Sequence, residues 1–402
     1  MSHVSDREGT TSSGMIKALL PLAVATFAVG TDAFVIAGLL PAIAADLEVG
    51  TAAAGQLVTV FALTLAITAP ILSWLLSSLD RRSALQLALA VFVVGNVATV
   101  LSPNYPLVMA ARVLTALGAA TITAMASSAA VAIAPEERRG RAMALVIGGL
   151  TLSTALGMPL GNLIGSVDWR LALWAVAGLG VLATLGITAL LPKISLPAVG
   201  LTARLAPLRN SKVLTILAAT ALVMAGHYTV YTYIGPITAD ATSGSFPHAL
   251  TLILFAWGLS VLAGNFLAGS WVDKISGEKV AVAALGGGAV MLVISPLTVG
   301  HLAIVIVWAL LWGATDGMAS VVQQHRLVMI APATAPLLFG LNSSAIYVGV
   351  ATGGILGAVS QEWLAITLLG VPAAAMALLA TAVTVLVGRR GSRPGQPDDH
   401  AA

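Results

Sequence analysis

Residues 27–44 read FAVGTDAFVIAGLLPAIA, a run that is apolar or small almost throughout but carries one carboxylate, Asp32. About 20 consecutive residues of this kind form a helix long enough to span a bilayer. A charge near the middle of such a span costs about 2.5–3.5 kcal/mol on insertion scales. The stretch therefore predicts a membrane-spanning helix whose carboxylate has a function.

The composition of the whole chain is typical of a membrane protein. Of its 402 residues, 58% are hydrophobic and 9% are charged, whereas a soluble domain carries about 25% charged residues. The apolar runs reach about 20 residues, which is helix length, whereas the strands of membrane barrels are alternating segments of about 10 residues. We therefore predict an all-α integral membrane protein.

The motif search argues against several functional classes. The chain has no cysteine, no P-loop, no H-E-x-x-H, no dinucleotide fingerprint and no G-x-S-x-G elbow. We therefore expect no enzyme, no metal, no cofactor and no direct use of ATP. The net charge of +3 does not indicate nucleic acid, because the basic residues fall in short loops.

Hydropathy and helix breakers predict twelve spans in two sets of six. The first set lies at 16–42, 52–77, 83–102, 106–133, 142–165 and 171–191. The second set lies at 213–237, 247–272, 280–299, 302–329, 336–359 and 364–388. The expected organisation is a tail (1–15), a six-helix bundle (16–191), a linker (192–212), a second six-helix bundle (213–388) and a C-terminal tail (389–402).

The distribution of basic residues predicts the orientation. If the N-terminus is cytosolic, nearly all loop Lys and Arg residues face the cytosol, and the outside loops hold only Arg170. The positive-inside rule then places both termini in the cytosol of a multi-pass protein of the plasma or inner membrane.

The two sets of spans resemble copies of each other. Gly157, Gly161, Gly165 and Val167 recur 192 positions later, as Gly349, Gly353, Gly357 and Val359. Asp80, in the loop after the second span, has its counterpart after the eighth span, in Asp273. Parallel six-span repeats are typical of transporters whose halves rock around a site at the midplane. The predicted fold is therefore two pseudo-symmetric six-helix bundles.

Four ionisable side chains lie in the apolar bodies of the spans: Asp32 in the first, Arg112 in the fourth, His227 in the seventh and Asp316 in the tenth. These equivalent helices are expected to surround the central cavity. A rise of about 1.5 Å per residue puts Asp32 and Arg112 at similar depths, so we expect an ion pair across the cavity that parts when Asp32 is protonated. The alternative is a static pair that only locks two helices.

The tenth span offers Asp316, which is a second protonation site, a contact for a cationic substrate or a partner of His227. His227, Tyr228 and Tyr231 are predicted to bind substrate through hydrogen bonds and ring contacts, the alternative being that they only pack. Gln323 and Gln324 are also predicted to bind substrate, although at most one of them faces the cavity.

Small residues dominate the fifth span. Gly149, Gly157, Gly161 and Gly165 permit close helix approach, and Pro159 removes a backbone hydrogen bond and favours a bend. We expect helix packing and gating here, although glycine-rich membrane helices also pack closely without any gating role.

Together these segments resemble the major facilitator superfamily over nearly the full chain, and within it the twelve-span drug:proton antiporters of the arabinose-efflux-like and chloramphenicol-resistance branch. The stretches that carry the resemblance are GTDAFVIAGLLPAIAADL, RVLTALGAA with Arg112, GMPLG with Pro159, GHYTVYTYIGP, and GNFLAGSWVDK with Gly269 and Asp273. The chain departs from the family where the usual first-span acid is replaced by Ala33. The family's loop motif after the second span usually has Gly, then Asp-Arg, then Gly-Arg. In this chain the loop is LSSLDRRSAL, which retains only Asp80, Arg81 and Arg82 as expected gating residues.

The resemblance implies a proton-coupled exporter of a small amphipathic molecule, most readily an antibiotic such as a chloramphenicol-type compound. The expected partners are this substrate, protons and the bilayer, and the protein is expected to be monomeric. Alternatives are a proton-coupled sugar or nucleoside transporter, working as an exporter or an importer, and a membrane sensor with a transporter fold.

Overall fold

In the part of the chain that the computed structural model describes, twelve helices are long and apolar enough to cross a membrane, which confirms the predicted number of spans. The structure describes residues 3–196, 200–272 and 274–391. The first six spans are α1 (His3–Asp46), α2 (Thr51–Leu75), α3 (Arg81–Leu101), α4 (Tyr105–Ile133), α5 with η3 and α6 (Arg139–Gly165), and α7 (Trp169–Leu190). The second six are α9 (Ser211–Tyr231), α12 (Ala249–Val272), α13 (Gly277–Ile294), α14 (Leu302–Ile330), α15 (Ala335–Ser360) and α16 (Gly370–Gly391).

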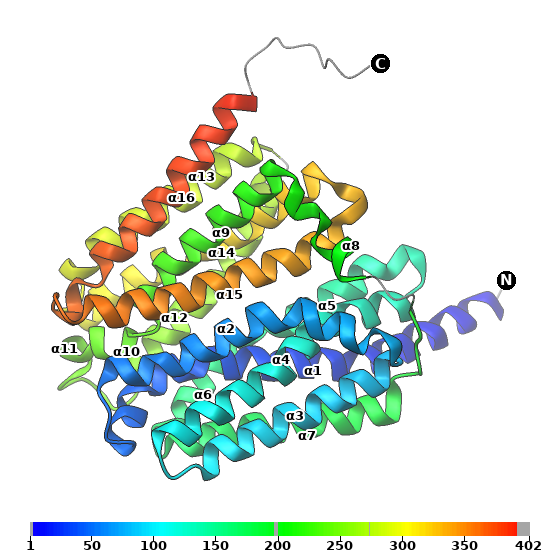
Figure 1. Ribbon diagram of the computed structural model, residues 1–402, viewed down its shortest axis with the longest axis horizontal. Coiled ribbons are helices and arrows are strands. Elements are labelled where there is room, and N and C mark those ends of the chain that lie inside the picture. The colour runs from blue at the N-terminus through cyan, green and yellow to red at the C-terminus, as the bar shows by residue number, and fades with distance from the viewer. Residues whose placement is uncertain (1–2, 197–199, 273, 392–402) are drawn as a thin grey trace.

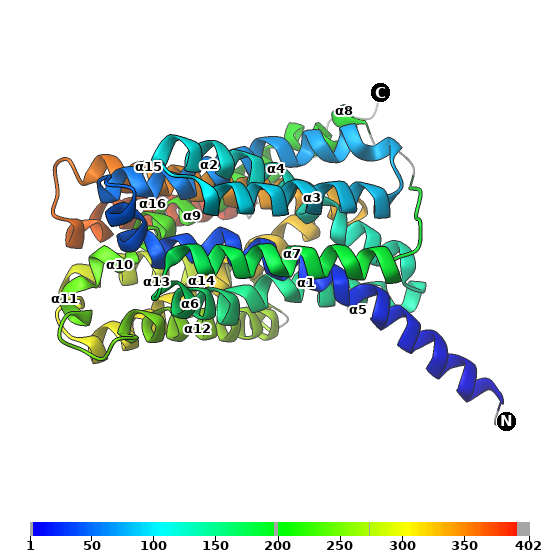
Figure 2. The ribbon, with the colours of Figure 1, turned by 90° about the horizontal axis from the view of Figure 1, so that it is seen from below.

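The helices form two bundles that lie side by side, α1 to α7 in one and α9 to α16 in the other (Figure 1). The connection between them contains α8 (Leu201–Leu205) and η4 (Ala206–Arg209) and crosses one end of the molecule. We call this end the linker face, and the opposite end, with α10 (Ile234–Ile237) and α11 (Ala239–Thr242), the far face. Figure 2 shows α1 extending beyond the bundle at the linker face.

Polar side chains begin several of the helices. Asp80, Asn104, Asp168 and Asn210 each accept a hydrogen bond from a main-chain N–H in the first turn of the helix that follows, which satisfies a donor that the helix cannot. The N-terminal segment before the first predicted span is helical too, because α1 begins at His3. Extending an existing helix requires no new nucleation.

Two predicted spans are interrupted by proline. In the fifth, a π-helical turn, η3 (Ser153–Gly157), joins α5 (Arg139–Leu152) to α6 (Met158–Gly165) directly before Pro159. Pro159 has no N–H to continue the α-helical ladder, and the wider turn absorbs the defect. The seventh span, expected to reach 237, is also interrupted: α9 ends at Tyr231, and after a turn at 232–233 the short helix α10 follows. Pro236 has no N–H to donate to the carbonyl of Thr232 one turn earlier, so the α-helical ladder is not continuous there.

Hydrogen bonds between the two bundles lie near the far face. Thr51 of α2 donates to Gln361 beyond the end of α15 at 3.0 Å. Thr251 of α12 donates to Asn162 of α6 at 2.7 Å. Both contacts lie at helix ends remote from the linker face, so the halves are tied together at the far face in this conformation.

Candidate functional site

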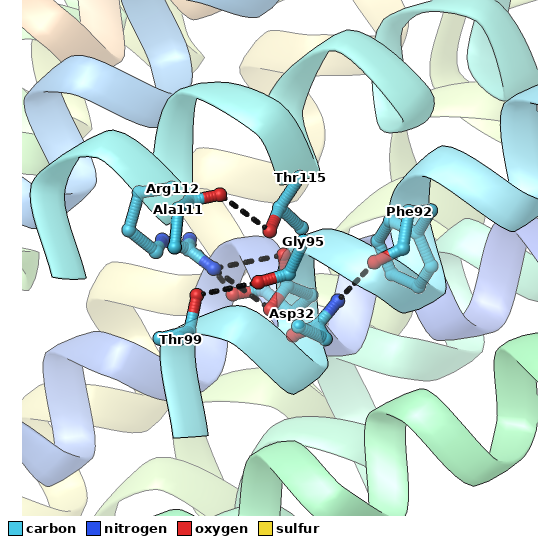
Figure 3. A network of polar contacts seen from close by, with 8 residues as sticks. Asp32, Phe92, Gly95, Thr99, Ala111, Arg112 and Thr115 are labelled. Atoms are coloured by element: carbon cyan, nitrogen blue, oxygen red, sulfur yellow. Dashed lines mark hydrogen bonds and ion pairs between the residues drawn. The ribbon is translucent and has the colours of Figure 1, made fainter. Parts of the chain in front are cut away.

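A buried ion pair lies inside the first bundle, between α1 and α4. One terminal nitrogen of Arg112 donates to both carboxylate oxygens of Asp32, at 2.8 and 3.0 Å, and the other reaches the main-chain oxygen of Asp32 at 3.5 Å. Both side chains have 0% of their surface exposed. Figure 3 shows the pair within a set of polar groups from α3 and α4. The contact predicted between these two residues is therefore present.

The predicted surroundings of this pair are wrong for this conformation, because neither residue faces an open cavity. Asp32 and Arg112 meet between α1 and α4 of the first bundle, as expected, but neither side chain has any exposed surface. The guanidinium lies over the ring of Phe61 of α2, with 4.4 Å between the guanidinium carbon and the ring centroid. This ring closes the site on one side and adds a cation–π contact.

The pair retains unused hydrogen-bonding capacity. Within the described part of the chain, Arg112 Nε and the side-chain oxygen of Asn96 have no partner. Nearby hydroxyls are already engaged with their own helices: Thr115 donates to Ala111 and Thr99 to Gly95, at 2.9 and 2.8 Å (Figure 3). Asp32 therefore depends on Arg112 for its charged contact, and a change in its protonation would act directly on the link between α1 and α4.

The glycines of the fifth span pack against the helix that carries Asp32. A β-carbon on Gly157 would meet Thr31, and one on Gly161 would lie 2.5 Å from a methyl group of Val35. Gly149 lies in the same way against the main chain of α1 at Ala23. The missing side chains let the two helices approach closely, so α1 is held between α4 and the interrupted fifth span.

A second polar contact joins His227 of α9 to Asp316 of α14. His227 Nδ1 lies 2.5 Å from the Asp316 carboxylate, and both residues are buried. The structure thus realises one of the three roles considered for Asp316, that of partner to His227. Within the described part, His227 Nε2 has no hydrogen-bond partner, so the imidazole can still form a hydrogen bond on its other side.

Aromatic rings form a continuous row from one bundle to the other. Phe34 of α1 lies 6.3 Å from Tyr228, and Tyr228 lies 5.2 Å from Tyr231, between ring centroids. The ring centroid of Tyr231 lies 4.6 Å from that of Trp257, and the centroid of Trp257 lies 5.6 Å from that of Trp312.

Tyr231 also bonds across the interface between the bundles. Its hydroxyl donates to the main-chain oxygen of Phe34 at 3.1 Å and lies against the sulfur of Met158. The expectation that Tyr228 and Tyr231 face an open cavity is not met in this conformation, because both are buried between the halves.

Trp257 and Trp312 were missed from the sequence. Their indole N–H groups are buried without a partner in the described part of the chain. A signal was available, because tryptophan in membrane helices usually lies at the bilayer interface, whereas these two lie well inside their spans.

The glutamines of the tenth span are held elsewhere. Gln323 accepts from Arg326 at 2.8 Å, and its amide reaches the main-chain oxygen of Ile216 at 3.4 Å. Gln324 is half-buried. Gln323 lies about two turns, or roughly 10 Å, from Asp316 along the helix, so the structure does not bring it to the His227 pair.

The loop residues expected to gate are placed as follows. Asp80 caps α3, and the hydrogen bonds from Ser83 hold the pKa of the Asp80 carboxyl below its usual range. Arg81 is buried, and its main-chain N–H donates to the main-chain oxygen of Ile194 in the linker at 2.8 Å. The guanidinium of Arg82 donates to the main-chain oxygen of Thr188.

In the second half, a β-carbon on Gly269 would meet no atom within 4 Å, so this glycine makes no close helix contact in this conformation. Its companion Asp273 lies outside the described residues. Among the described residues, no group of three or more His, Cys, Asp or Glu side chains could hold a metal ion.

Twelve apolar helices in two six-helix halves, with titratable pairs buried inside each half, define a multi-pass membrane transporter rather than an enzyme. The family model of the Major Facilitator Superfamily matches residues 22–247. The chain belongs to this superfamily.

Individual relatives agree with this assignment. The inner membrane transport protein YdhP of Escherichia coli (strain K12) is 31% identical, over 92% of this chain and 96% of the relative. A chloramphenicol resistance protein of Streptomyces lividans is 31% identical, over 84% of this chain and 87% of the relative. The fold matches the crystal structure of a bacterial homologue of the human lysosomal transporter Spinster, in an inward-facing, unoccupied conformation. The TM-score is 0.76, with 16% identity over 94% of this chain and 97% of the other.

Proposed function

We propose that this transporter is a proton-coupled exporter of a small amphipathic molecule, such as an antibiotic of the chloramphenicol type. The observation that carries the proposal is the ion pair between Asp32 and Arg112. Both side chains are fully buried, and a terminal nitrogen of Arg112 lies 2.8 Å from a carboxylate oxygen of Asp32. An ionisable residue inside a membrane is a functional candidate by default. The similarity to a chloramphenicol resistance protein supports export of a drug.

Protonation of Asp32 is the proposed coupling step. A neutral carboxyl group no longer attracts the guanidinium of Arg112, and the link between α1 and α4 weakens. Because α1 also packs against the glycines of the fifth span, this change alters the position of α1 within its bundle. The electrical part of the proton gradient supplies about 2.3 kcal/mol per charge per 100 mV.

Alternating access follows from movement of the two halves, 16–191 and 213–388, as units around the aromatic row. With both termini in the cytosol, as the positive-inside rule favours, the linker face is cytosolic and the far face is outside. The hydrogen bonds at the far face then belong to a state that is closed to the outside. The exporter is proposed to work as a monomer.

Substrate is proposed to separate the aromatic row and to use its unpaired donors. Tyr228 and Tyr231 offer rings and hydroxyls, and the indole N–H groups of Trp257 and Trp312 lack partners. His227 and Asp316 offer a second titratable pair beside this row. An amphipathic molecule with an aromatic ring and hydrogen-bond acceptors matches this chemistry.

The proposal is tested by susceptibility of cells that express the wild type or the Asp32→Asn variant to a panel of antibiotics. Asn keeps the size of Asp but does not titrate. We expect the wild type to raise the inhibitory concentration of at least one aromatic antibiotic and the variant, at equal abundance in the membrane, to lose this effect. Protection against none of the panel, together with efflux of a radiolabelled sugar or nucleoside, would replace the drug by the alternative substrate class. Equal protection by both proteins would contradict the role of Asp32.

A further inference from the structure

A cavity of about 310 Å³ opens on the linker face of the second bundle, apart from the aromatic row. Three helices form it: the start of α9, the start of α13 and the end of α14. Its polar wall carries Lys212, Glu278, His325 and Arg326, and Ile216 and Met329 belong to its apolar wall. None of these side chains takes part in the proposed coupling.

The charges on the wall favour an anion. Lys212 and Arg326 are cationic, and Glu278 is the one acid among the described lining residues. Arg326 is oriented by hydrogen bonds to Gln323 at 2.8 Å and to Thr384 at 3.5 Å. Its guanidinium has five N–H donors, so further donors remain for a ligand.

The start of α13 also lies at the cavity. The 18-residue helix α13 begins at the cavity, and Ser276 before it makes no side-chain capping hydrogen bond. The first N–H groups of such a helix, together with its dipole, attract an anion. His325 Nδ1 is buried without a partner in the described part of the chain, and a β-carbon on Gly277 would lie 3.3 Å from it. Because Gly277 has no side chain, the imidazole and the start of α13 lie side by side.

We propose that this cavity binds a phosphate group, the chemistry shared by the headgroup of an anionic phospholipid and by free phosphate. Basic side chains from α9 and α14 and the amino end of α13 surround a phosphate on different sides, and such convergent charge-assisted hydrogen bonds are strong. Ile216 and the exposed Met329 can receive the apolar part of a lipid. None of the residues that line this cavity belongs to the aromatic row in which substrate is proposed to bind.

The test uses the delipidated full-length protein in a neutral detergent, with thermal unfolding read against added phosphatidylglycerol, phosphatidylcholine and inorganic phosphate. We expect phosphatidylglycerol, inorganic phosphate or both to raise the Tm, and phosphatidylcholine to leave it unchanged. Stabilisation by phosphatidylglycerol alone identifies a lipid headgroup, and stabilisation by inorganic phosphate alone identifies free phosphate. The same Tm with all three additives would overturn the proposal.

Charge variants distinguish this cavity from general attraction to a basic surface. Lys212→Gln should weaken binding about five- to tenfold, since it removes a charged donor. Lys279→Gln is the matched control, because Lys279 lies in the same part of the chain and is exposed but does not belong to the cavity wall. Glu278→Gln should tighten binding severalfold by removing the lining carboxylate. Equal weakening by Lys212→Gln and Lys279→Gln, or weaker binding in Glu278→Gln, would contradict the site.

Discussion

Replacement of Arg112 by Leu, with Asp32 left in place, tests the coupling of α1 to α4. The two side chains have no exposed surface and lie 2.8 Å apart, so water does not replace the lost partner. Removing one member of a buried ion pair costs about 3–5 kcal/mol, because the remaining charge is uncompensated. We expect Arg112→Leu to lower the free energy of unfolding by this amount and to abolish transport.

The double variant Asp32→Asn/Arg112→Leu should be more stable than Arg112→Leu alone. It buries no unpaired charge, and exchange of a whole buried pair for neutral groups is often close to neutral. The double-mutant cycle should therefore give a coupling energy of at least about 3 kcal/mol, because the double variant lacks the loss seen in Arg112→Leu. The measurement is unfolding by denaturant in mixed micelles for the wild type, both single variants and the double variant.

The exposed ion pair between Asp46 and Arg170 is the matched control. Its side chains lie 2.6 Å apart but are 41% and 25% exposed. Asp46→Asn should change the free energy of unfolding by less than about 1 kcal/mol, as solvent screens such pairs. The reasoning is refuted if the losses in Asp32→Asn and Arg112→Leu add to within about 0.5 kcal/mol, because additive losses are typical of residues that act independently.

Three further predictions concern packing and the contact between the halves. Cysteines at Thr59 and Gly354 should form a disulfide between the halves, since a β-carbon at Gly354 would lie 3.6 Å from that of Thr59 and the chain has no other cysteine. Transport should stop when this disulfide forms on oxidation and return when it is reduced. Transport by the oxidised, cross-linked protein would show that the halves do not need to separate. Gly161→Leu should lower the free energy of unfolding by about 1–3 kcal/mol, because the added side chain overpacks the contact with α1. Gly178→Ala is the control and should not lower it, because a β-carbon at Gly178 meets nothing within 4 Å. Both free energies are measured by chemical unfolding. Tyr231→Phe should weaken substrate binding about two- to tenfold in an equilibrium binding assay if the Tyr231 hydroxyl forms a hydrogen bond to the substrate. Unchanged binding together with a lower Tm would show that Tyr231 serves only in packing.

The twelve spans could be predicted because their length and hydropathy are properties of the chain itself. Hydropathy extends the seventh span to 237, because mostly apolar residues continue beyond Tyr231, where α9 ends. Pro236 is evident in the sequence, but hydropathy alone does not detect the interruption of a helix. The π-helical turn before Pro159 was likewise foreseen only as a bend, because the choice between a kink and a wider turn depends on the packing of α1 and α12 against it.

The candidate site was predicted through the residues that are costly in a membrane. This criterion identified Asp32, Arg112, His227 and Asp316, and the structure pairs them within each half. It did not give the direction of each side chain, because rotation of a helix about its axis is set by its neighbours. The sealed position of the first pair under Phe61 therefore escaped the sequence, as did the row through Trp257.

The measurement that tests the central claim most directly is transport in proteoliposomes with and without an imposed pH gradient, for the wild type and Asp32→Asn. We expect the gradient to accelerate transport by the wild type and to drive accumulation of substrate against its own concentration gradient. Asp32→Asn should bind and exchange substrate but ignore the pH gradient. Acceleration by the gradient to the same extent in both proteins would show that Asp32 is not the coupling site.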